Sequence, residues 1–180
     1  SPSKRNNPFA NSGIVVEIDA EKDLYKYEKF GALKGLEFQK ELEKLAFNAG
    51  GRSQVAPAQR LTDFVEGNLS NDLNPTSYQP GLKSAPLHSL VPKIIGGRLR
   101  TGFAEFGRKM KGFYTAEANI VGVESRTSSP VTIPRTEKLA HPDIAGLYPC
   151  GEGGGYAGGI VSAAMDGERC AEAAINMLKG

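Results

Sequence analysis

The stretch that decides the fold runs from Gly146 to Lys179 and reads GLYPCGEGGGYAGGIVSAAMDGERCAEAAINMLK. An extended apolar segment ends at Cys150, six glycines follow within residues 151–159, and a helical pattern begins at Ile160. In α/β proteins this order places a loop at the carboxyl end of a strand and directs the next helix toward a ligand crevice. We therefore predict an α/β fold, or α+β for the portion of the chain that is present.

The glycine loop has the residue types of a binding site. The N-terminus of a helix attracts anions, because unpaired N–H groups and the positive end of the helix dipole meet there. Glycines let a ligand approach the backbone closely, and the carboxylate of Glu152 would accept hydrogen bonds from a diol. The alternative is a tight turn in which Glu152 only complements the helix dipole. The residue types alone leave both interpretations open.

Two further helices are predicted upstream. Apolar side chains at Phe38, Leu42 and Leu45 recur with helical spacing and the pattern stops at Gly50. A second apolar stripe, from Ile95 to Met110, follows Pro92. Between these helices, residues 50–92 are rich in Pro, Gly, Asn and Ser and predict surface loops, with one short helical candidate over residues 57–65.

Short strands are predicted at residues 14–18, 120–123 and 131–133, where β-branched residues gather between turn signals. We expect the first strand and the segment from Ile120 onward to meet in one sheet. The absence of an initiator Met, together with a strand so close to Ser1, predicts that the chain is a piece of a longer protein.

Composition excludes several classes of protein. With 39% hydrophobic and 23% charged residues the chain should fold, and a net charge of +2 is too balanced for a nucleic-acid binder. No apolar stretch reaches the ~18–20 residues of a membrane span. Two cysteines cannot form a disulfide framework, so we expect a cytoplasmic protein.

Three separated motifs give the sequence a family resemblance. The stretch from Gly146 to Gly167 resembles the carboxyl-terminal flavin motif of the uncharacterised FAD-dependent dehydrogenases (NAD/FAD-utilising dehydrogenases). The segments from Ala10 to Val16 and from Glu124 to Arg135 are similar to the same family, as are the stretches from Gly35 to Phe47 and from Ala56 to Arg60. The resemblance therefore covers nearly the whole chain.

The resemblance implies a flavoprotein whose Rossmann-type half lies upstream and is the partner of this piece. Residues 1–18 would then contain a strand returning to the parent sheet. Residues 19–112 would form a mainly helical insert on the substrate side, and residues 113–180 the C-terminal part of the FAD-binding domain. The parent would be an FAD-dependent oxidoreductase acting on a small organic substrate, with FAD held by the full-length protein and the isolated piece inactive.

The resemblance also implies roles for particular residues. Glu152 would accept a hydrogen bond from a ribityl hydroxyl of FAD, and backbone N–H groups at the start of the last helix would face the pyrimidine edge of the isoalloxazine. The cofactor-binding candidates are Gly151, Glu152, Gly153, Gly158, Gly159 and Ile160.

A second candidate site lies in the polar turn after the 120–123 strand. One fixed charge and three hydroxyls, with an upstream amide, suit an anionic substrate group or the polar edge of the flavin; the alternative is a turn whose hydroxyls satisfy local backbone. The candidates for the substrate or flavin edge are Arg126, Thr127, Ser128, Ser129 and Asn11.

Other residues favour structural interpretations. His88 and His141 are expected to be ordinary loop histidines, and Cys150 and Cys170 to be unpaired packing thiols. The basic faces of the helix after Pro92 favour solvation, but a rival hypothesis makes the chain a non-catalytic helical recognition module that uses this helix.

Two expectations follow if the Rossmann-type half of the parent protein is absent from this chain. We expect weak FAD binding or none by these 180 residues, because one loop cannot offset the ordering cost of a large cofactor. We also expect self-association through exposed strand edges and apolar surface.

Overall fold

The computed structural model describes residue 4 and residues 6–126 and 128–179. The described chain divides into two compact units. Unit 1 comprises Ser1–Asp23 and Lys40–Val123, and unit 2 comprises Leu24–Gln39 and Glu124–Gly180. Helix α2 (Lys34–Ala49) begins in unit 2 and continues into unit 1. It confirms the helix predicted over Phe38, Leu42 and Leu45.

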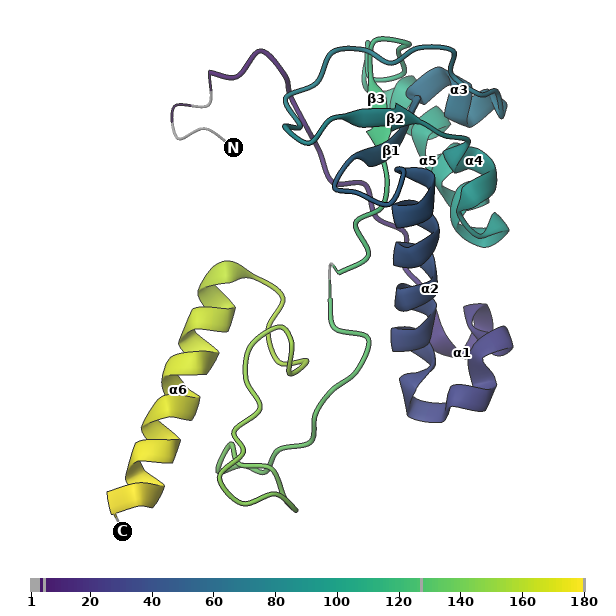
Figure 1. Cartoon of the computed structure of the whole chain (residues 1–180). Helices are drawn as coiled ribbons and strands as arrows, with labels where there is room; N and C mark the ends of the chain where they lie inside the picture. Colours follow the sequence, from purple (N-terminus) through teal and green to yellow (C-terminus); the bar gives the residue numbers. More distant parts are fainter. Residues whose placement is uncertain (1–3, 5, 127, 180) are drawn as a thin grey trace. The chain divides into compact units, whose positions relative to one another are not determined.

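A small mixed sheet organises unit 1 (Figure 1). Its strand order is β2-β1-β3, with bounds Leu82–Ser84, Ala56–Arg60 and Asn119–Val121. Strand β1 pairs in parallel with β2, in the register Ala56 to Leu82, and antiparallel with β3, in the register Gln59 to Ile120. Helices combined with this sheet confirm the predicted α/β or α+β fold. The strand predicted at residues 120–123 is present as β3, but it starts one residue earlier and ends at Val121.

The prediction of surface loops over residues 50–92 was wrong in part, because this region contains β1, the central strand of the sheet. Strand β1 has the sequence APAQR, which carries little strand propensity and a proline. The missing N–H of Pro57 is tolerated because it falls at the end of the pairing with β3, whose register covers Ala58, Gln59 and Arg60. The carbonyl of Pro57 still accepts a hydrogen bond from Gly122 at 3.1 Å. The predicted helix over residues 57–65 begins only at Leu61.

Four helices complete unit 1. They are α1 (Ala20–Asp23), α3 (Leu61–Glu66), α4 (Leu87–Leu90) and α5 (Lys93–Lys109). Helix α5 confirms the second predicted helix. Its Phe103 meets Phe64 of α3 edge to face, with ring centroids 5.9 Å apart.

The apolar core of unit 1 lies among these elements. Its buried members are Leu42, Leu61, Phe64, Leu87, Val91 and Phe103. Ile14 and Ile120 both pack against this core from partly buried positions. Residues 14–18 nevertheless form no strand with the described chain, and Val15 is 66% exposed. The expected pairing of the two segments is therefore absent, although both contact the same core.

Three arginines of α5 form ion pairs or hydrogen bonds with other residues of unit 1. Arg98 forms a 2.7 Å ion pair with Asp23, Arg100 donates to the carbonyl of Phe64 at 3.1 Å, and Arg108 pairs with Glu105 on the same helix. Three of the basic residues of α5 therefore have partners within unit 1.

Unit 2 contains a 3-10 helix at Tyr25–Leu33, the first turns of α2, and helix α6 at Ile160–Lys179. Helix α6 confirms the predicted closing helix. Residues 131–133 and 147–150 belong to no helix or strand of the described chain, so the strand predicted at residues 131–133 is absent. Among the described residues, no helix is both long and apolar enough to cross a membrane.

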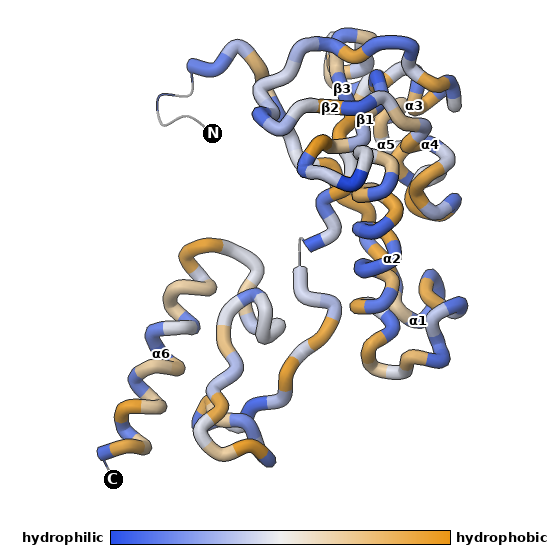
Figure 2. Tube along the Cα trace, viewed as in Figure 1, coloured by the Kyte–Doolittle hydropathy of each residue, from blue (hydrophilic) through white to orange (hydrophobic). Residues whose placement is uncertain are grey.

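The apolar stripe of α6 is exposed in this chain. Ile160 is 92% exposed and Leu178 is 80% exposed, while the buried residues of the helix are Asp166 and Cys170. Figure 2 shows hydrophobic positions along both ends of this helix. The buried positions of α6 are therefore not its large apolar side chains but Asp166 and Cys170.

Candidate functional site

The glycine loop, residues 151–159, closes on itself and on the segment before it. The N–H of Gly155 donates to the carbonyl of Glu152 at 3.0 Å, and the N–H of Ile133 donates to the carbonyl of Gly154 at 3.1 Å. At Gly155 the backbone has φ +84°, and an added Cβ would lie 2.8 Å from the carbonyl oxygen of Val131. This glycine is therefore required by the packing of the loop against its own chain.

Two other loop glycines have no such structural reason. A Cβ added at Gly153 or Gly158 would meet nothing within 4 Å, and neither residue has a positive φ. Both residues are exposed. The structure thus separates glycines that pack the loop from glycines that leave its surface open, and the open ones suit close approach of a ligand.

The N-terminus of α6 presents free backbone donors. Gly159 accepts a hydrogen bond from the N–H of Ala163 at 2.8 Å, and its own N–H donates to Oγ of Ser162 at 3.1 Å. Ser162, rather than Glu152, therefore accepts the N–H of the residue that precedes the helix. Across residues 6–126 and 128–179, the N–H groups of Ile160, Val161 and Ser162 find no acceptor.

Glu152 is exposed at the start of the loop. Its carboxylate makes no hydrogen bond or ion pair with any residue that the structure describes. An exposed acceptor, open glycines and free N–H donors lie on one loop and the helix that follows it. This set fits a ligand with both hydroxyls and hydrogen-bond acceptors, such as the ribityl chain and pyrimidine edge of a flavin.

A buried ion pair holds the loop against α6. The guanidinium of Arg135 donates to both carboxylate oxygens of Asp166, at 2.9 and 2.8 Å. Asp166 also accepts from the N–H of Gly151 at 2.9 Å, and Arg135 donates to the carbonyl of Pro149 at 2.9 Å. The ring of Tyr156 lies 3.6 Å from the guanidinium carbon. Two side chains therefore join three segments of unit 2.

These contacts lower the pKa of the Asp166 carboxyl. The hydrogen bonds from Arg135, then the one from Gly151, lower the pKa of Asp166 to about 2, against a desolvation effect of opposite sign. Neither Arg135 nor Asp166 was among the predicted site residues. Two features of the sequence could have pointed to this pair. Asp166 lies one helical turn before Cys170, and Arg135 lies in the motif that precedes the glycine loop.

The depressed pKa predicts an acid-labile unit 2. A carboxyl whose pKa is lower in the folded than in the unfolded state stabilises the folded state fully at pH values above the unfolded-state pKa of 3.8. This stabilisation is lost as the pH falls toward the folded-state pKa of about 2. We expect unfolding of α6, followed by circular dichroism at 222 nm, to become easier between about pH 4 and pH 2. In Asp166→Asn this part of the pH dependence should be missing, and an unchanged acid transition would contradict the prediction.

In the second predicted site, residues 126–129, a hydroxyl bonds to the backbone nearby. Ser129 donates its hydroxyl to the carbonyl of Val131 at 2.6 Å, as expected for the polar-turn alternative. Arg126 and Ser128 are exposed, and Thr127 lies outside the described residues. Asn11 is exposed and belongs to unit 1. Arg126, Ser128 and Ser129 therefore belong to unit 2, whereas Asn11 belongs to unit 1.

His88 is more constrained than a loop histidine. Gln59, which is 0% exposed, accepts the backbone N–H of His88 at 3.1 Å, and its amide nitrogen lies 2.8 Å from Nδ1 of the same residue. Because the amide oxygen is already used by the N–H, the amide nitrogen donates to Nδ1. This assigns the ring proton to Nε2.

The titration of His88 should reflect this burial. Desolvation, followed by the charge of Arg100, lowers its pKa below 6.5. The chain has two histidines, so His141→Gln leaves a single imidazole for NMR titration. We expect a midpoint below 6.5 and a contribution to stability that is lost as pH falls below that value. A midpoint at or above 6.5 would contradict the buried geometry.

Comparisons with known proteins give the class and then the family. The family model "FAD-dependent protein, C-terminal domain-like" matches residues 1–127. The chain is thus a flavoprotein-associated domain. It belongs to the FAD-dependent protein, C-terminal domain-like family.

One relative extends the comparison. A protein of Clostridium beijerinckii, described as uncharacterized, is 39% identical over 165 residues, which cover 91% of this chain and 30% of the relative. The chain therefore spans about a third of the length of that relative. The family match ends at residue 127, whereas the glycine loop lies at residues 151–159.

Proposed function

We propose that this chain is the C-terminal part of an FAD-dependent oxidoreductase, a dehydrogenase of a small organic substrate. The observation that carries the proposal is membership in a family of FAD-dependent proteins. The length of the relative supports a larger parent, in which an upstream Rossmann-type half supplies the remaining cofactor contacts. FAD, when bound, supplies the redox chemistry, and the protein supplies binding and orientation.

The glycine loop is the proposed flavin contact of this chain. Glu152 would accept a hydrogen bond from a ribityl hydroxyl, since its exposed carboxylate is unused within the described residues. The free N–H groups at the start of α6, from Ile160 to Ser162, would face the pyrimidine edge of the flavin. The positive end of the helix dipole there favours negative charge on that edge. Gly151, Gly153, Gly158 and Gly159 would complete the contact.

The polar turn after unit 1 is the proposed contact for the substrate or for the flavin edge. Arg126 supplies a permanent positive charge, and Ser128 an exposed hydroxyl. The hydroxyl of Ser129 is already committed to the carbonyl of Val131, which makes it the weakest member of this set. Asn11 would join the set only if the full-length protein brings it near.

The direct test is the colour of the full-length protein. A bound flavin absorbs near ~450 nm because the cofactor carries the redox chromophore. We expect a yellow purified protein whose absorbance bleaches on reduction with dithionite. A full-length protein that is colourless, and stays so after incubation with FAD and removal of free cofactor, would overturn the proposal.

Replacing Gly158 with Ala in the full-length protein should weaken FAD binding without weakening the fold. The added methyl meets nothing within 4 Å of this chain, so the apo melting temperature should stay the same. If the flavin approaches the backbone here, the dissociation constant should rise about three- to tenfold, or roughly 1 kcal/mol. Gly97→Ala is the matched control, because this site on α5 is equally open. Unchanged FAD affinity for Gly158→Ala would place the flavin elsewhere.

A further inference from the structure

The residues on either side of Cys150 contact the part of α6 that carries Cys170. Pro149 accepts a weak hydrogen bond from Sγ of Cys170 at 3.8 Å, and Gly151 donates its N–H to Asp166 at 2.9 Å. Asp166 and Cys170 are four residues apart, one turn of α6. Cys150 is therefore bracketed on both sides by contacts to the turn of α6 that carries Cys170.

The two thiols have unequal environments. Cys150 is exposed and Cys170 is buried. Burial, then the charge of Asp166 and the neighbouring Cys150 thiol, raise the pKa of Cys170, while the guanidinium of Arg135 acts in the opposite direction. Nη1 of Arg135 lies 3.5 Å from Sγ of Cys170. An exposed thiol is the first to meet an oxidant, and a buried neighbour is placed to resolve the product.

We propose that Cys150 and Cys170 form a redox-active dithiol that closes to a disulfide on reaction with a low-molecular-weight disulfide. The expectation of two unpaired packing thiols rested on the absence of a Cys-x-x-Cys pair, but the tertiary structure brings the segments that carry them together from twenty positions apart. The inference concerns unit 2 alone and does not depend on flavin binding.

The reaction balances without a further oxidant. The Cys150 thiolate attacks one sulfur of the small disulfide RSSR, which forms a mixed disulfide and releases one RS⁻. Cys170 loses its proton, with Arg135 beside the developing charge, and attacks the Cys150 sulfur to release the second RS⁻. Both protein thiols are oxidised, and RSSR is reduced to two RSH once the released protons are taken up.

The disulfide would fix the start of the glycine loop to α6. Cys150 directly precedes Gly151 and Glu152, so the bond would join the loop to the helix at a second point beside the Arg135–Asp166 pair. Closing a loop of about twenty residues restricts the unfolded chain. We expect oxidation to raise the melting temperature of unit 2 by several degrees, roughly 5–10 °C.

The test uses oxidised glutathione on the 180-residue chain. Trypsin cuts after Lys138, Arg169 and Lys179, so the two cysteines fall in different peptides, residues 139–169 and 170–179. Mass spectrometry without reduction should detect these peptides joined, and dithiothreitol should separate them. Cys170→Ser should instead accumulate the mixed disulfide at Cys150, and Cys150→Ser should remain unreacted.

Three outcomes would overturn the proposal. These are a stable mixed disulfide at Cys150 in the parent chain, a disulfide between two chains, and joined peptides without a rise in melting temperature. Because Cys150 is exposed, Cys150→Ser should fold as the parent does. Oxidised glutathione should leave the melting temperature of this variant unchanged. That variant separates the effect of the disulfide from any other effect of the oxidant.

Discussion

Asp166→Asn should destabilise unit 2 by about 3 kcal/mol, within the range for removing one partner of a buried ion pair. The substitution keeps the shape of the side chain but leaves the guanidinium of Arg135, whose side chain is only 12% exposed, without its countercharge. It also weakens the acceptor for the N–H of Gly151. Since the chain has no Trp, urea unfolding is best followed by circular dichroism at 222 nm, to which α6 contributes together with α2 and α5.

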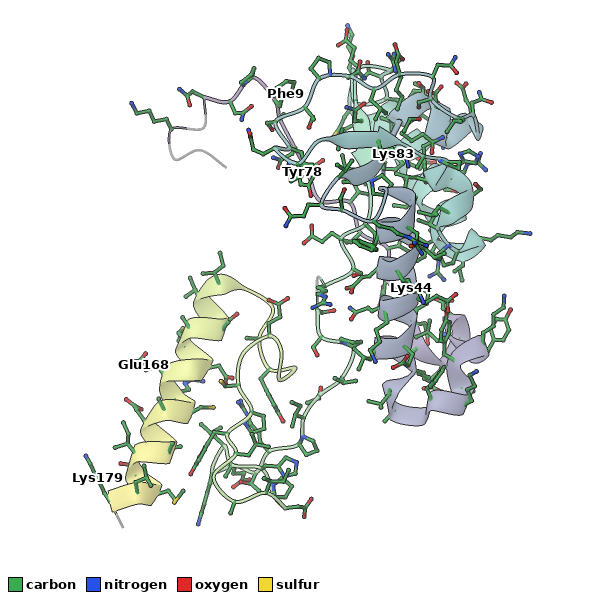
Figure 3. All side chains as sticks on the ribbon, in the orientation of Figure 1. Phe9, Lys44, Tyr78, Lys83, Glu168 and Lys179 are labelled. Atoms are coloured by element: carbon green, nitrogen blue, oxygen red, sulfur yellow. The ribbon has the colours of Figure 1, made fainter. Side chains whose placement is uncertain are left out.

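Glu168→Gln is the matched control for this experiment. Glu168 is exposed on the same helix, and Figure 3 shows it on the side of α6 away from the glycine loop. Its neutralisation should change stability by no more than about 0.5 kcal/mol. A double-mutant cycle with Arg135→Ala would then measure the coupling between Arg135 and Asp166. A loss below about 1 kcal/mol in Asp166→Asn would mean that the pair does not hold the loop.

Glu152→Ala should lower the FAD affinity of the full-length protein about ten- to a hundredfold. A charge-assisted hydrogen bond to a ribityl hydroxyl contributes roughly 1.5–3 kcal/mol, and each ~1.4 kcal/mol is a factor of ten. Cofactor should be lost during purification. Because the carboxylate has no partner among the described residues, the apo melting temperature should stay close to that of the parent.

The alternative role of Glu152 gives the opposite pattern. If the carboxylate only complements the dipole of α6, its loss costs about 0.3–1 kcal/mol of stability and leaves flavin affinity intact. Measuring the FAD dissociation constant and the apo melting temperature for Glu152→Ala and Glu152→Gln distinguishes the two roles. Gln keeps an acceptor oxygen without the charge, so it should retain part of the affinity under the flavin hypothesis.

Local sequence patterns were sufficient for the three long helices. Helices α2, α5 and α6 carry apolar residues at helical spacing, and glycine or proline lies near their ends. The same reasoning failed for β1, whose sequence APAQR has no strand pattern. That strand exists because β2 and β3 pair with it on either side, and pairing between distant segments is not encoded in local propensity.

The candidate site divides in the same way. The sequence alone determined the glycine loop, the helix that follows it and an acidic residue at its start, because glycine spacing and helical periodicity are local properties. Only the tertiary structure decided which glycines pack the loop and which leave it open, since that depends on Val131 and its neighbours. It also decided the Arg135–Asp166 pair and the approach of residues 149–151 to the turn of α6 that carries Cys170, because segments far apart in the sequence become partners only when the chain has folded.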